Sequence, residues 1–561
     1  MLDLTRYREK KIAPRAVFDA LPERRTRVRF MIEEGGDYRA ITWGGFARDI
    51  RNVALFLAAS GLVKGDRAAI FAPNRVEWMS AALGIQAAGG VMVPIYPAST
   101  AAQAAYVAKH SDARVVFLDT KALLAKVIDA ITEYENVERF VLLDDSLDVA
   151  AAIADARAAG RDVPPSLEIE QRFVPWTKAL SIGASADGGS RFEDRMASVG
   201  LDDVGIMLYT SGTTGHPKGV PLTHANVAVN GEDWLTVNAP LLSEGMVDLL
   251  WLPMSHVFGF GEACLGNTLG FTTYLTEPHK VLASLPDVRP DVFMSVPAYW
   301  EKLAKMAGER PERLRELTGG HLAFCLSGGA GLSRDVKEFF RSAGLLIIEG
   351  YGLTECSPTL TMNRHDAFRF DSVGKPFPSV TVRLAEDGEI LAKGPSVFRG
   401  YHKDEAATRD VFTDDGWFKT GDVGRFTEDG FLQIIDRKKE ILVTAGGKNV
   451  PPQNIEVRFR DFPFVEHVVV YGDGKKYLVA GVWANANVEG GTGEGIEARV
   501  ARAVEAVNKE LASFEQLKRF RVMTAPLTVE SGLLTSTLKI KRKKVYETFK
   551  SEFESLYEGA P

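Results

Sequence analysis

The segment Tyr209–Gly219 reads Y-T-S-G-T-T-G-H-P-K-G and contains five hydroxyl side chains, three glycines and one lysine. Apolar residues at 204 and 206–208 precede it and predict a short buried strand. A glycine-rich turn lets backbone N–H groups converge on an anion, because glycine has no Cβ to block the approach. The hydroxyl groups add hydrogen-bond donors, and Lys218 adds a positive charge. The segment therefore predicts a loop that binds the phosphates of a nucleotide.

Two other interpretations of this loop are weaker. A polar surface turn accounts for the glycines and the hydroxyl groups, but it does not require the lysine. The common P-loop requires Gly directly before Lys and Ser or Thr directly after it. Here Pro217 precedes Lys218 and Gly219 follows it. The segment thus indicates a nucleotide site of a different kind.

Length and composition limit the class of protein. A chain of 561 residues is too long for one core, and length alone indicates about two to four subdomains. A hydrophobic content of 45% and a charged content of 25% are ordinary for a globular protein. The net charge of −7 argues against a general nucleic-acid binder. Cys264, Cys325 and Cys356 lie far apart, which indicates a reducing compartment and no zinc site.

The chain offers no sign of a membrane span or a secretory signal. Its N-terminus is charged, and no apolar run reaches the length that a bilayer requires. We therefore expect a cytoplasmic protein. A peripheral membrane contact and a homodimer are left open.

Helix and strand patterns alternate between residues 41 and 118. Helices are predicted over 46–57, 76–88 and 101–109, and strands over 67–71, 91–95 and 115–118. Such alternation predicts an α/β layer structure with parallel strands. Residues 1–40 receive no assignment. Residues 146–200 are interpreted as an irregular peripheral connection with one helix over 149–158.

The last third of the chain has a different pattern. Short strands over 380–384, 389–392 and 431–435, separated by D-G and K-G turns, predict a small β-subdomain. Strands over 467–471 and 478–483 and helices over 496–514 and 543–557 then predict an α+β domain.

Two later segments carry side chains that suit a nucleotide. The segment Ile347–Pro358 reads I-I-E-G-Y-G-L-T-E-C-S-P. In it Tyr351 offers a ring for stacking on a base, and Glu355 offers the hard oxygen ligand that Mg²⁺ prefers. In the segment 416–422, the carboxylate of Asp422 suits the diol of a sugar, which can donate two hydrogen bonds to it.

The segment Tyr209–Gly219 resembles the phosphate-binding signature of the adenylate-forming superfamily, which includes acyl-CoA synthetases, luciferases and the adenylation domains of peptide synthetases. The resemblance extends from about residue 41 to the C-terminus. It implies an α/β fold with a large N-terminal domain, residues 1–436, made of layered α/β subdomains plus a small β-subdomain. A small mobile α+β C-terminal domain, residues 437–561, follows. The implied co-substrates and cofactor are ATP, coenzyme A and Mg²⁺.

The resemblance also assigns roles to individual residues. Contacts with the nucleotide or with CoA fall on Thr210, Ser211, Gly212, Thr213, Thr214, Gly215, Lys218, Gly328, Gly329, Ala330, Glu349, Gly350, Tyr351, Gly352, Thr354, Asp422, Arg437, Lys439, Gly446, Gly447 and Lys448. Glu355 and Thr210 are the implied metal ligands. The acyl site is implied at His256, Phe258, Gly259, Val296 and Tyr299. The implied catalytic residues are Lys539, Lys218, Thr210 and Glu355.

The residues of the acyl site also allow a simpler interpretation. A histidine among apolar residues is often a satisfied core residue. The aromatic set Phe258, Phe260, Tyr299 and Trp300 suits either an apolar substrate or an ordinary core.

The late lysine lies in the segment Leu534–Arg542, which reads L-T-S-T-L-K-I-K-R. The usual family version has Gly before the catalytic lysine, whereas Leu538 takes that place here, as in several long-chain fatty-acid enzymes. Lys539 aligns best and Lys541 is the alternative. A basic solvated patch is the structural interpretation of the same charges.

Together these features predict an enzyme that joins a fatty acid, of the long-chain type, to CoA through an acyl-adenylate. No general base is required, because the carboxylic acid is already ionised at neutral pH. The alternatives are a ligase for another carboxylic acid, acyl transfer to a carrier protein, and a nucleotide-binding scaffold without turnover.

Overall fold

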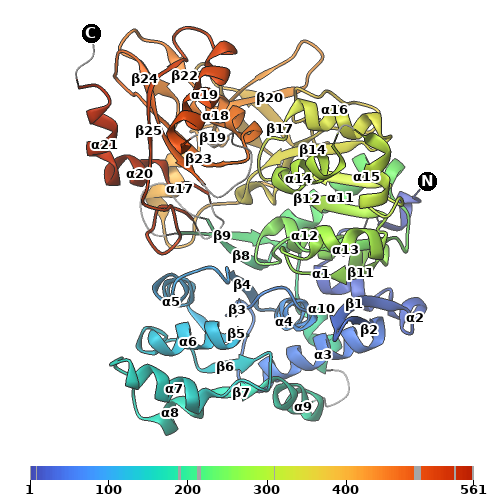
Figure 1. The fold of residues 1–561 in the computed structure, drawn as a ribbon. Helices are drawn as coiled ribbons and strands as arrows, with labels where there is room; N and C mark the ends of the chain where they lie inside the picture. The colour runs from blue at the N-terminus through green and yellow to red at the C-terminus, as the bar shows by residue number, and fades with distance from the viewer. Residues whose placement is uncertain are drawn as a thin grey trace. The chain divides into compact units, whose positions relative to one another are not determined.

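The computed structural model describes residues 2–7, 9–186, 191–210, 217–308, 310–485, 495–535 and 539–558. The chain divides into two compact units (Figure 1). Unit 1 comprises Met1–Val382, Ala392–Phe418 and Thr427–Leu432, and unit 2 comprises Arg383–Leu391, Lys419–Phe426 and Gln433–Pro561. The predicted boundary between residues 436 and 437 stays a prediction.

Unit 1 contains a seven-stranded sheet in the order β7-β6-β5-β3-β4-β8-β9. Its strands are β3 (Arg67–Phe71), β4 (Val91–Ile95), β5 (Ala113–Leu118), β6 (Arg139–Leu142), β7 (Phe173–Pro175), β8 (Val204–Thr210) and β9 (Lys218–Thr223). Neighbours pair in parallel up to β8, and β8 pairs with β9 antiparallel. The parallel α/β layer predicted for residues 41–118 is thus confirmed. The strands are nearly continuous apolar runs because helices cover both faces of such a sheet.

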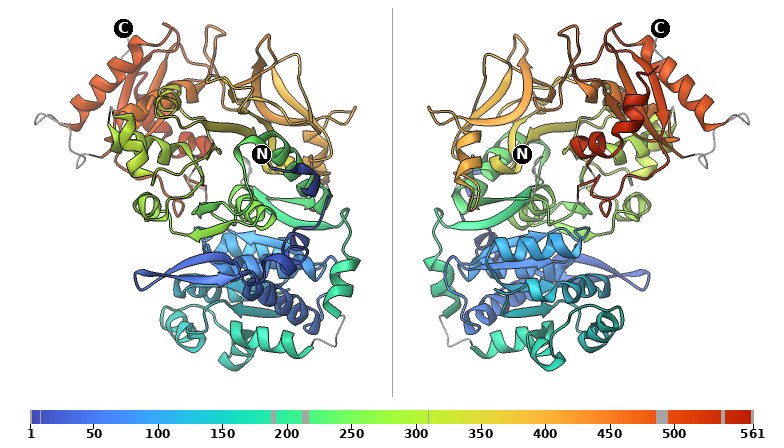
Figure 2. Two further views of the ribbon diagram at one scale, coloured as in Figure 1. Left: turned by 90° about the vertical axis from the view of Figure 1, so that its right-hand side faces the viewer. Right: turned by 90° about the vertical axis from the view of Figure 1, so that its left-hand side faces the viewer.

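Helices surround this sheet, as both views of Figure 2 show for the blue-to-teal part of the chain. They are α3 (Trp43–Ala59), α4 (Val76–Ala87), α5 (Ala101–His110), α6 (Lys121–Asp129), α7 (Val149–Ala158), α8 (Ser166–Glu170), α9 (Trp176–Ala186) and α10 (Arg191–Ser198). The helix predicted over 149–158 is confirmed as α7.

The interpretation of residues 146–200 as irregular is wrong. Strand β7 extends the sheet by pairing in parallel with β6. Helix α9 packs closely on α3, and a Cβ at Gly183 would lie 1.9 Å from the carbonyl oxygen of Asn52. The Ala, Gly and Ser residues that suggested a loop instead permit this close helix packing.

A second sheet of unit 1 has nine strands in the order β16-β15-β14-β13-β12-β10-β11-β1-β2. They are β1 (Val28–Glu34), β2 (Asp37–Thr42), β10 (Val247–Leu250), β11 (Thr272–Leu275), β12 (Val292–Ser295), β13 (Phe324–Ser327), β14 (Ile347–Gly352), β15 (Thr359–Met362) and β16 (Lys375–Pro376). Pairing is parallel from β1 to β14 and antiparallel at both edges. Residues 1–40, which received no assignment, supply β1 and most of β2.

Further helices belong to unit 1. They are α1 (Ala13–Phe18), α2 (Leu21–Arg24), α11 (His224–Asn238), α12 (Val257–Leu269), α13 (Val281–Val288), α14 (Pro297–Ala307), α15 (Pro311–Leu317), α16 (Arg334–Ser342) and α17 (Glu405–Val411).

A charged network lies buried between the second sheet and α12. The guanidinium of Arg29 donates to Asn267 Oδ1 at 2.8 Å and to Thr273 Oγ1 at 2.7 Å. The carboxyl groups of Asp248 and Glu262 interact electrostatically, and burial raises the pKa of both, that of Asp248 to about 6. Neither oxygen of Glu262 has a donor among the described residues. A shared proton satisfies this geometry, because two adjacent ionised carboxylates repel each other.

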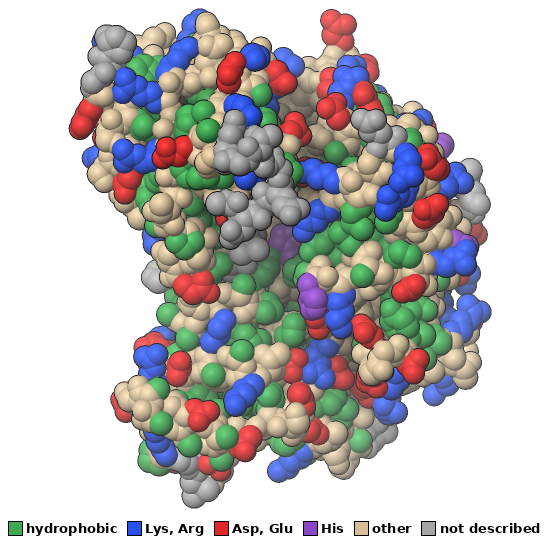
Figure 3. Space-filling view, viewed as in Figure 1, with side chains coloured by type: hydrophobic (Ala, Val, Ile, Leu, Met, Phe, Trp, Pro, Cys, Tyr) green, Lys and Arg blue, Asp and Glu red, His purple; other side chains and the backbone are tan. Residues whose placement is uncertain are grey.

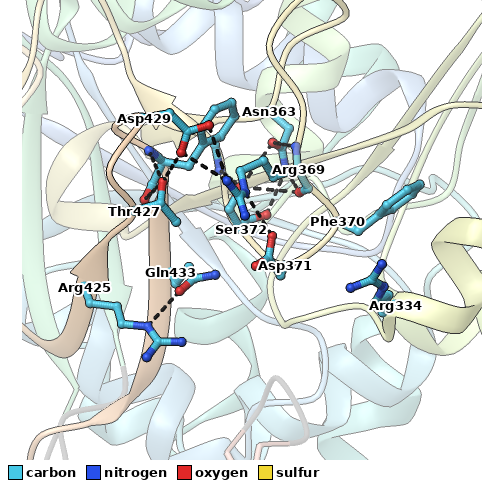
Figure 4. Close-up of polar contacts among 12 residues, drawn as sticks. Arg334, Asn363, Arg369, Phe370, Asp371, Ser372, Arg425, Thr427, Asp429 and Gln433 are labelled. Atoms are coloured by element: carbon cyan, nitrogen blue, oxygen red, sulfur yellow. Dashed lines mark hydrogen bonds and ion pairs between the residues drawn. The ribbon is translucent and has the colours of Figure 1, made fainter.

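The loop after β15 is fixed by polar contacts with a neighbouring turn (Figure 4). Arg369 forms ion pairs with Asp371 at 3.2 Å and with Asp429 at 3.1 Å. Asn363 Nδ2 donates to the carbonyl oxygen of Ser372 at 2.8 Å. At the end of the loop, Gly374 has φ +87°, and a Cβ there would lie 1.8 Å from the carbonyl carbon of Met362. Only glycine fits this position.

The sheet β17-β18-β19-β20 has most of its residues in unit 2. Its strands are β17 (Thr381–Leu384), β18 (Glu389–Lys393), β19 (Phe418–Phe426) and β20 (Leu432–Arg437). The three predicted strands of the small β-subdomain are confirmed. Strand β19, which carries Asp422, was not predicted as a strand.

The rest of unit 2 is an α+β arrangement, as predicted. Its elements are β21 (Leu442–Val443), β22 (Asn449–Val450), α18 (Pro452–Glu456), β23 (Val465–Tyr471), β24 (Leu478–Ala484), α19 (Ile496–Lys509), β25 (Leu517–Val522), α20 (Arg542–Thr548) and α21 (Lys550–Ser555). Alternate residues of β23 and β24 pack into two separate apolar clusters, one with α19 and one with α20 and α21. This alternation is the two-residue period of a strand that is covered on both faces.

None of the helices that the structure describes is both long and apolar enough to cross a bilayer. In Figure 3 the surface around α5–α8 carries interspersed acidic and basic side chains, with no large patch of one charge.

Candidate functional site

The two ends of the predicted phosphate loop face each other across an antiparallel strand pair. Thr210 on β8 and Lys218 on β9 are direct partners in the register. Both residues are half-buried. Ser211, Gly212, Thr213, Thr214 and Gly215 lie outside the described residues. The pairing places Thr210 and Lys218 on neighbouring strands, where β8 ends and β9 begins.

A tyrosine that the sequence did not single out connects Lys218 to Glu355. The ammonium of Lys218 lies 4.8 Å from the ring centroid of Tyr401, and the hydroxyl of Tyr401 donates to Glu355 Oε1 at 2.9 Å. Burial raises the pKa of Tyr401, and the negative charge of Glu355 raises it further. The phenol therefore stays neutral and keeps its donor role. The only sequence signal for Tyr401 is an aromatic residue after Gly400.

Glu355 itself lies on a short 3-10 helix, Thr354–Cys356, that directly follows β14. Gly350, Tyr351 and Gly352 form the end of β14 and pair with β15. A Cβ at Gly352 would lie 1.9 Å from the carbonyl oxygen of Pro358, so the close return of the chain requires glycine there. The segment thus places Thr354 and Glu355, which are both half-buried, together just after the end of a strand.

Glu349 has a different environment from the residues that follow it. Its carboxylate accepts from Leu332 N at 2.8 Å and pairs with Lys337 Nζ at 2.7 Å, and both side chains are buried. These protein donors occupy the carboxylate. Glu349 therefore fixes the chain directly after the turn that contains Gly328, Gly329 and Ala330.

Three distant segments meet beside that turn. A Cβ at Gly328 would lie 2.9 Å from Phe258 Cε1, and one at Gly329, which has φ +83°, would lie 3.9 Å from Val296 Cγ1. Gly329 and Ala330 are exposed. The structure thus brings the turn that contains Gly328 and Gly329 close to two residues of the proposed acyl site, and glycine at 328 permits the close approach of Phe258.

His256 and Gly259 shape the start of α12, where the sequence indicated only a packed turn. His256 is the N-cap residue, and its Nδ1 accepts from Phe258 N at 3.2 Å. A Cβ at Gly259 would lie 2.4 Å from the carbonyl oxygen of Pro253, so Gly259 permits close packing of the helix.

The four aromatic residues near this helix divide into two kinds. Phe260 and Trp300 are buried in the main core of unit 1, with 3% and 0% exposure. Phe258 and Tyr299 are half-buried, and the Tyr299 hydroxyl donates to the carbonyl oxygen of Pro278 at 2.9 Å. The interpretation as ordinary core therefore holds for Phe260 and Trp300, and only Phe258 and Tyr299 remain candidates for contact with a substrate.

In unit 2, three predicted site residues influence one another. The carboxylate of Asp422 is buried and pairs with Arg437 Nε at 2.8 Å. The Lys539 side chain keeps contact with solvent, yet the surrounding protein lowers the pKa of its ammonium. The positive charge of Arg437 lowers that pKa further, and Asp422 opposes the shift. A negative charge close to Lys539 would raise this lowered pKa again and favour the protonated ammonium.

The backbone holds Lys539 at the end of a short turn. Thr535 N donates to the carbonyl oxygen of Lys539 at 2.8 Å, and Lys539 N donates to Thr535 Oγ1 at 3.0 Å. Leu534 and Ile540 form an antiparallel bridge beside it.

A buried ion network begins three residues later. Arg542 donates to both carboxylate oxygens of Glu456, at 2.6 and 2.7 Å, and lies 3.3 Å from Glu440 Oε2. Burial alone lowers the pKa of Arg542, but the two carboxylates outweigh it and raise the pKa above the ordinary value. Lys541, the alternative catalytic lysine, has a pKa lowered by burial and by Lys544.

The remaining predicted residues of unit 2 are exposed. Lys439 follows β20, and Gly446, Gly447 and Lys448 form the turn between β21 and β22. Gly447 has φ +71°, and its N–H donates to the carbonyl oxygen of Thr444 at 2.8 Å.

The possible metal ligands of the site are few. Among the described residues, no group of three or more His, Cys, Asp or Glu side chains forms a metal site. Glu355 and Thr210 provide one carboxylate and one hydroxyl. That set fits Mg²⁺, which typically binds one or two carboxylates together with the phosphates of a substrate.

Comparison with known proteins gives the family. The model of the AMP-binding enzymes matches residues 18–402, and that of the AMP-binding enzyme C-terminal domain matches residues 439–561. A long-chain-fatty-acid–CoA ligase of Mycobacterium bovis is 32% identical over 587 aligned positions, which cover 93% of each chain. A long-chain-fatty-acid–CoA ligase of Xenopus laevis is 26% identical over 94% of this chain and 81% of its own.

A solved structure shows the same fold. The adenylation domain of a carboxylate reductase from Mycobacterium chelonae superimposes with a TM-score of 0.79 at 23% identity, over 99% of this chain and 92% of that one. The motif at Tyr209–Gly219, the segment with Tyr351 and Glu355, and these matches over nearly the whole length agree: the chain belongs to the AMP-binding enzymes, the adenylate-forming family of the acyl-CoA synthetases.

Proposed function

We propose that the protein joins a long-chain fatty acid to coenzyme A in two steps, with ATP converted to AMP and pyrophosphate. The observation that carries the proposal is the connected set Lys218, Tyr401 and Glu355, which places a cation, a neutral donor and an anion in sequence beside Thr210. A phosphoryl transfer needs such positioned charges more than it needs an acid or a base.

The first step activates the carboxylate. An ionised carboxylate is a poor electrophile, and attack by its oxygen on the α-phosphate of ATP attaches AMP as a leaving group and releases pyrophosphate. Lys218 would balance the charge of the departing phosphates, and Lys539 would bridge the attacking carboxylate and the α-phosphate. When bound, Mg²⁺ supplies positive charge to the phosphates, and Glu355 with Thr210 would hold it. Asp422 and Arg437 would hold the ribose, and Tyr351 the adenine.

The second step transfers the acyl group to the thiol of CoA. The thiol loses its proton to solvent, the sulfur forms a bond to the acyl carbon, and AMP leaves with the electron pair of the broken C–O bond. In this step Lys539 must lie away from the acyl carbon, so that the thiol can reach it. A rotation of the C-terminal domain about Lys439 would serve both steps, with Gly446, Gly447 and Lys448 beside the thiol.

The chain-length proposal rests on the relatives and on the apolar side chains near the glycine turn. The Mycobacterium bovis and Xenopus laevis relatives are named for long-chain fatty acids. Phe258, Val296 and Tyr299 are half-buried apolar or aromatic side chains, as expected for the wall of an acyl site.

A panel of acids tests the proposal. Purified protein with ATP, Mg²⁺ and CoA should release AMP with saturated acids of long chain length, and more slowly with acetate, an aromatic acid and an amino acid. CoA-free incubation should give pyrophosphate exchange with the same acids only. Preference for a short or aromatic acid would show that the substrate is not a long-chain fatty acid. Release of pyrophosphate followed by acyl transfer to a carrier protein, but not to CoA, would show that the acyl acceptor is a carrier protein. Failure of every acid to promote pyrophosphate release would leave a nucleotide-binding scaffold.

A further inference from the structure

Helix α5 contacts both strands of the hairpin that carries Thr210 and Lys218. The hydroxyl of Tyr106 donates to the carbonyl oxygen of Pro217 at 3.3 Å, directly before β9. One turn later, His110 Nδ1 lies 2.8 Å from the hydroxyl of Tyr209, directly before Thr210 on β8. Residues four apart lie on the same face of a helix, so one face of α5 reaches both ends of the predicted phosphate loop.

Ring contacts hold these side chains in place. The rings of Tyr106 and His110 stack with centroids 5.2 Å apart and planes at 23°. The Tyr209 ring meets the His110 ring edge-on at 5.7 Å. Such packed aromatic groups lose little further freedom when they form a hydrogen bond, which makes them suitable for fixing a backbone position.

A second segment, residues 401–403, contacts both β9 and the end of α5. His402 N donates to the carbonyl oxygen of Gly219 on β9 at 2.8 Å. Lys403 Nζ donates to the carbonyl oxygen of His110 at 3.1 Å, at the end of α5. The residue before them is Tyr401, which contacts Lys218 and Glu355. The strand pair is therefore tied on both sides to elements that lie outside the hairpin.

We propose that Tyr106 and His110 are positioning residues for nucleotide binding: α5 fixes the distance between Tyr209 and Pro217, and thereby the placement of Thr210 and Lys218. Neither residue needs to touch ATP. Ordinary packing of α5 would require the aromatic rings, but not a hydroxyl directed at Pro217 and a ring nitrogen directed at Tyr209. The inference rests on the proposed function, because it concerns the same ATP site.

We call the contacts of Tyr106 with Pro217 and of His110 with Tyr209 the brace. Removal of one hydroxyl group, with a matched control, tests it. Tyr106→Phe keeps the stacked ring and removes the hydroxyl that donates to Pro217. Tyr134→Phe makes the same chemical change at a buried tyrosine of the same unit, whose hydroxyl has no partner among the described residues. Removing one neutral hydrogen bond should raise the KM for ATP about threefold to tenfold for Tyr106→Phe. The KM for the fatty acid should not change, and Tyr134→Phe should leave both constants unchanged.

ATP affinity should also be measured without turnover, from the dependence of the melting temperature on ATP concentration. Tyr106→Phe should show the same loss of affinity there. Unchanged affinity, an equal rise in the KM values for ATP and fatty acid, or the same effect in Tyr134→Phe would overturn the proposal. A wild-type protein that releases no pyrophosphate with any acid would instead count against the proposed function, since the brace requires only ATP binding.

A double-mutant cycle tests the second contact. His110→Phe and Tyr209→Phe remove the same hydrogen bond from opposite sides and keep both rings. Each should weaken ATP binding, and the double variant should lose less than the sum of the two single losses, because both substitutions remove the one hydrogen bond that the two residues share. Additive losses would show that the bond between His110 and Tyr209 is not the cause, and would overturn this part of the brace. If the His110 variant does not fold, Tyr106→Phe still decides the question.

Discussion

Each unit buries one arginine beside two acidic side chains, yet the charges are paired differently. In unit 2, Arg542 binds both oxygens of Glu456 and approaches Glu440, so the charges compensate one another. In unit 1, Arg29 donates to neutral partners, and Asp248 and Glu262 contact each other instead. A buried charge is tolerated when it is paired, and burial raises the pKa of a carboxyl group that forms no ion pair.

The difference has a consequence for each part of the site. Arg542 lies three residues from Lys539, so its ion network anchors the segment that carries the proposed catalytic lysine. Glu262 lies on α12, whose first turn follows His256 and contains Phe258. The first network holds its segment by charge, and the second holds a helix by a shared proton.

The largest effect is expected at the lysine anchored by the paired network. Lys539→Ala should slow acyl-adenylate formation by about a thousandfold, the loss expected when one charge-stabilising group is removed. Thioester formation from supplied acyl-adenylate should stay largely intact, because Lys539 acts only in the first step. Pyrophosphate exchange and thioester release measure the two steps.

Lys541→Ala is the matched control, since it removes the same charge two residues away. It should change either step by less than about twofold. Equal loss of both steps in the Lys539 variant would end its assignment, and a larger loss in the Lys541 variant would transfer the role to Lys541.

A smaller effect is expected from Glu456→Gln, which breaks the paired network. The amide cannot provide the charge that Arg542 requires, and loss of a charged hydrogen bond should lower local stability by about 2 kcal/mol. Hydrogen exchange of the peptides that cover 452–470 and 542–549 should rise in parallel. Glu440→Gln, at the longer 3.3 Å contact, should have a weaker effect. Similar exchange in both variants and in the wild type would contradict the idea that the network holds this segment.

The smallest effect is expected from the same substitution in unit 1, with the opposite sign. Burial raises the pKa of Asp248 in the folded state, and burial together with the negative charge of Asp248 raises the pKa of Glu262. The folded protein then binds more protons than the unfolded chain, so these groups cost no stability below the ordinary carboxyl pKa and an increasing amount as pH rises through the raised values. Glu262→Gln removes that cost and keeps a donor toward Asp248.

The melting temperature of Glu262→Gln minus that of the wild type should therefore grow from pH 5 to pH 9, by an amount equivalent to about 1 kcal/mol. Glu456→Gln provides the comparison, because its difference from the wild type should be negative at every pH in this range. A pH-independent difference for Glu262→Gln would show that the two carboxyl groups do not share a proton.

Much of this molecule could be predicted from local patterns. The strand at Arg67–Phe71 and the helix at 149–158 follow from apolar periodicity, and the family follows from the segments around Lys218 and Glu355. Tyr401 was missed because its contact with Glu355 joins residues 46 positions apart. Strand β25 was missed because polar residues interrupt its pattern. The prediction of an irregular connection over 146–200 failed at Gly183, because the small residues there permit close helix packing and do not mark a loop.

The cap at the start of α12 limits what His256 can do. While the imidazole is neutral, a ring nitrogen that accepts a backbone N–H carries no proton, so the other nitrogen, Nε2, must carry it. In that state the ring offers a donor to an approaching acid and has no lone pair left to remove a proton.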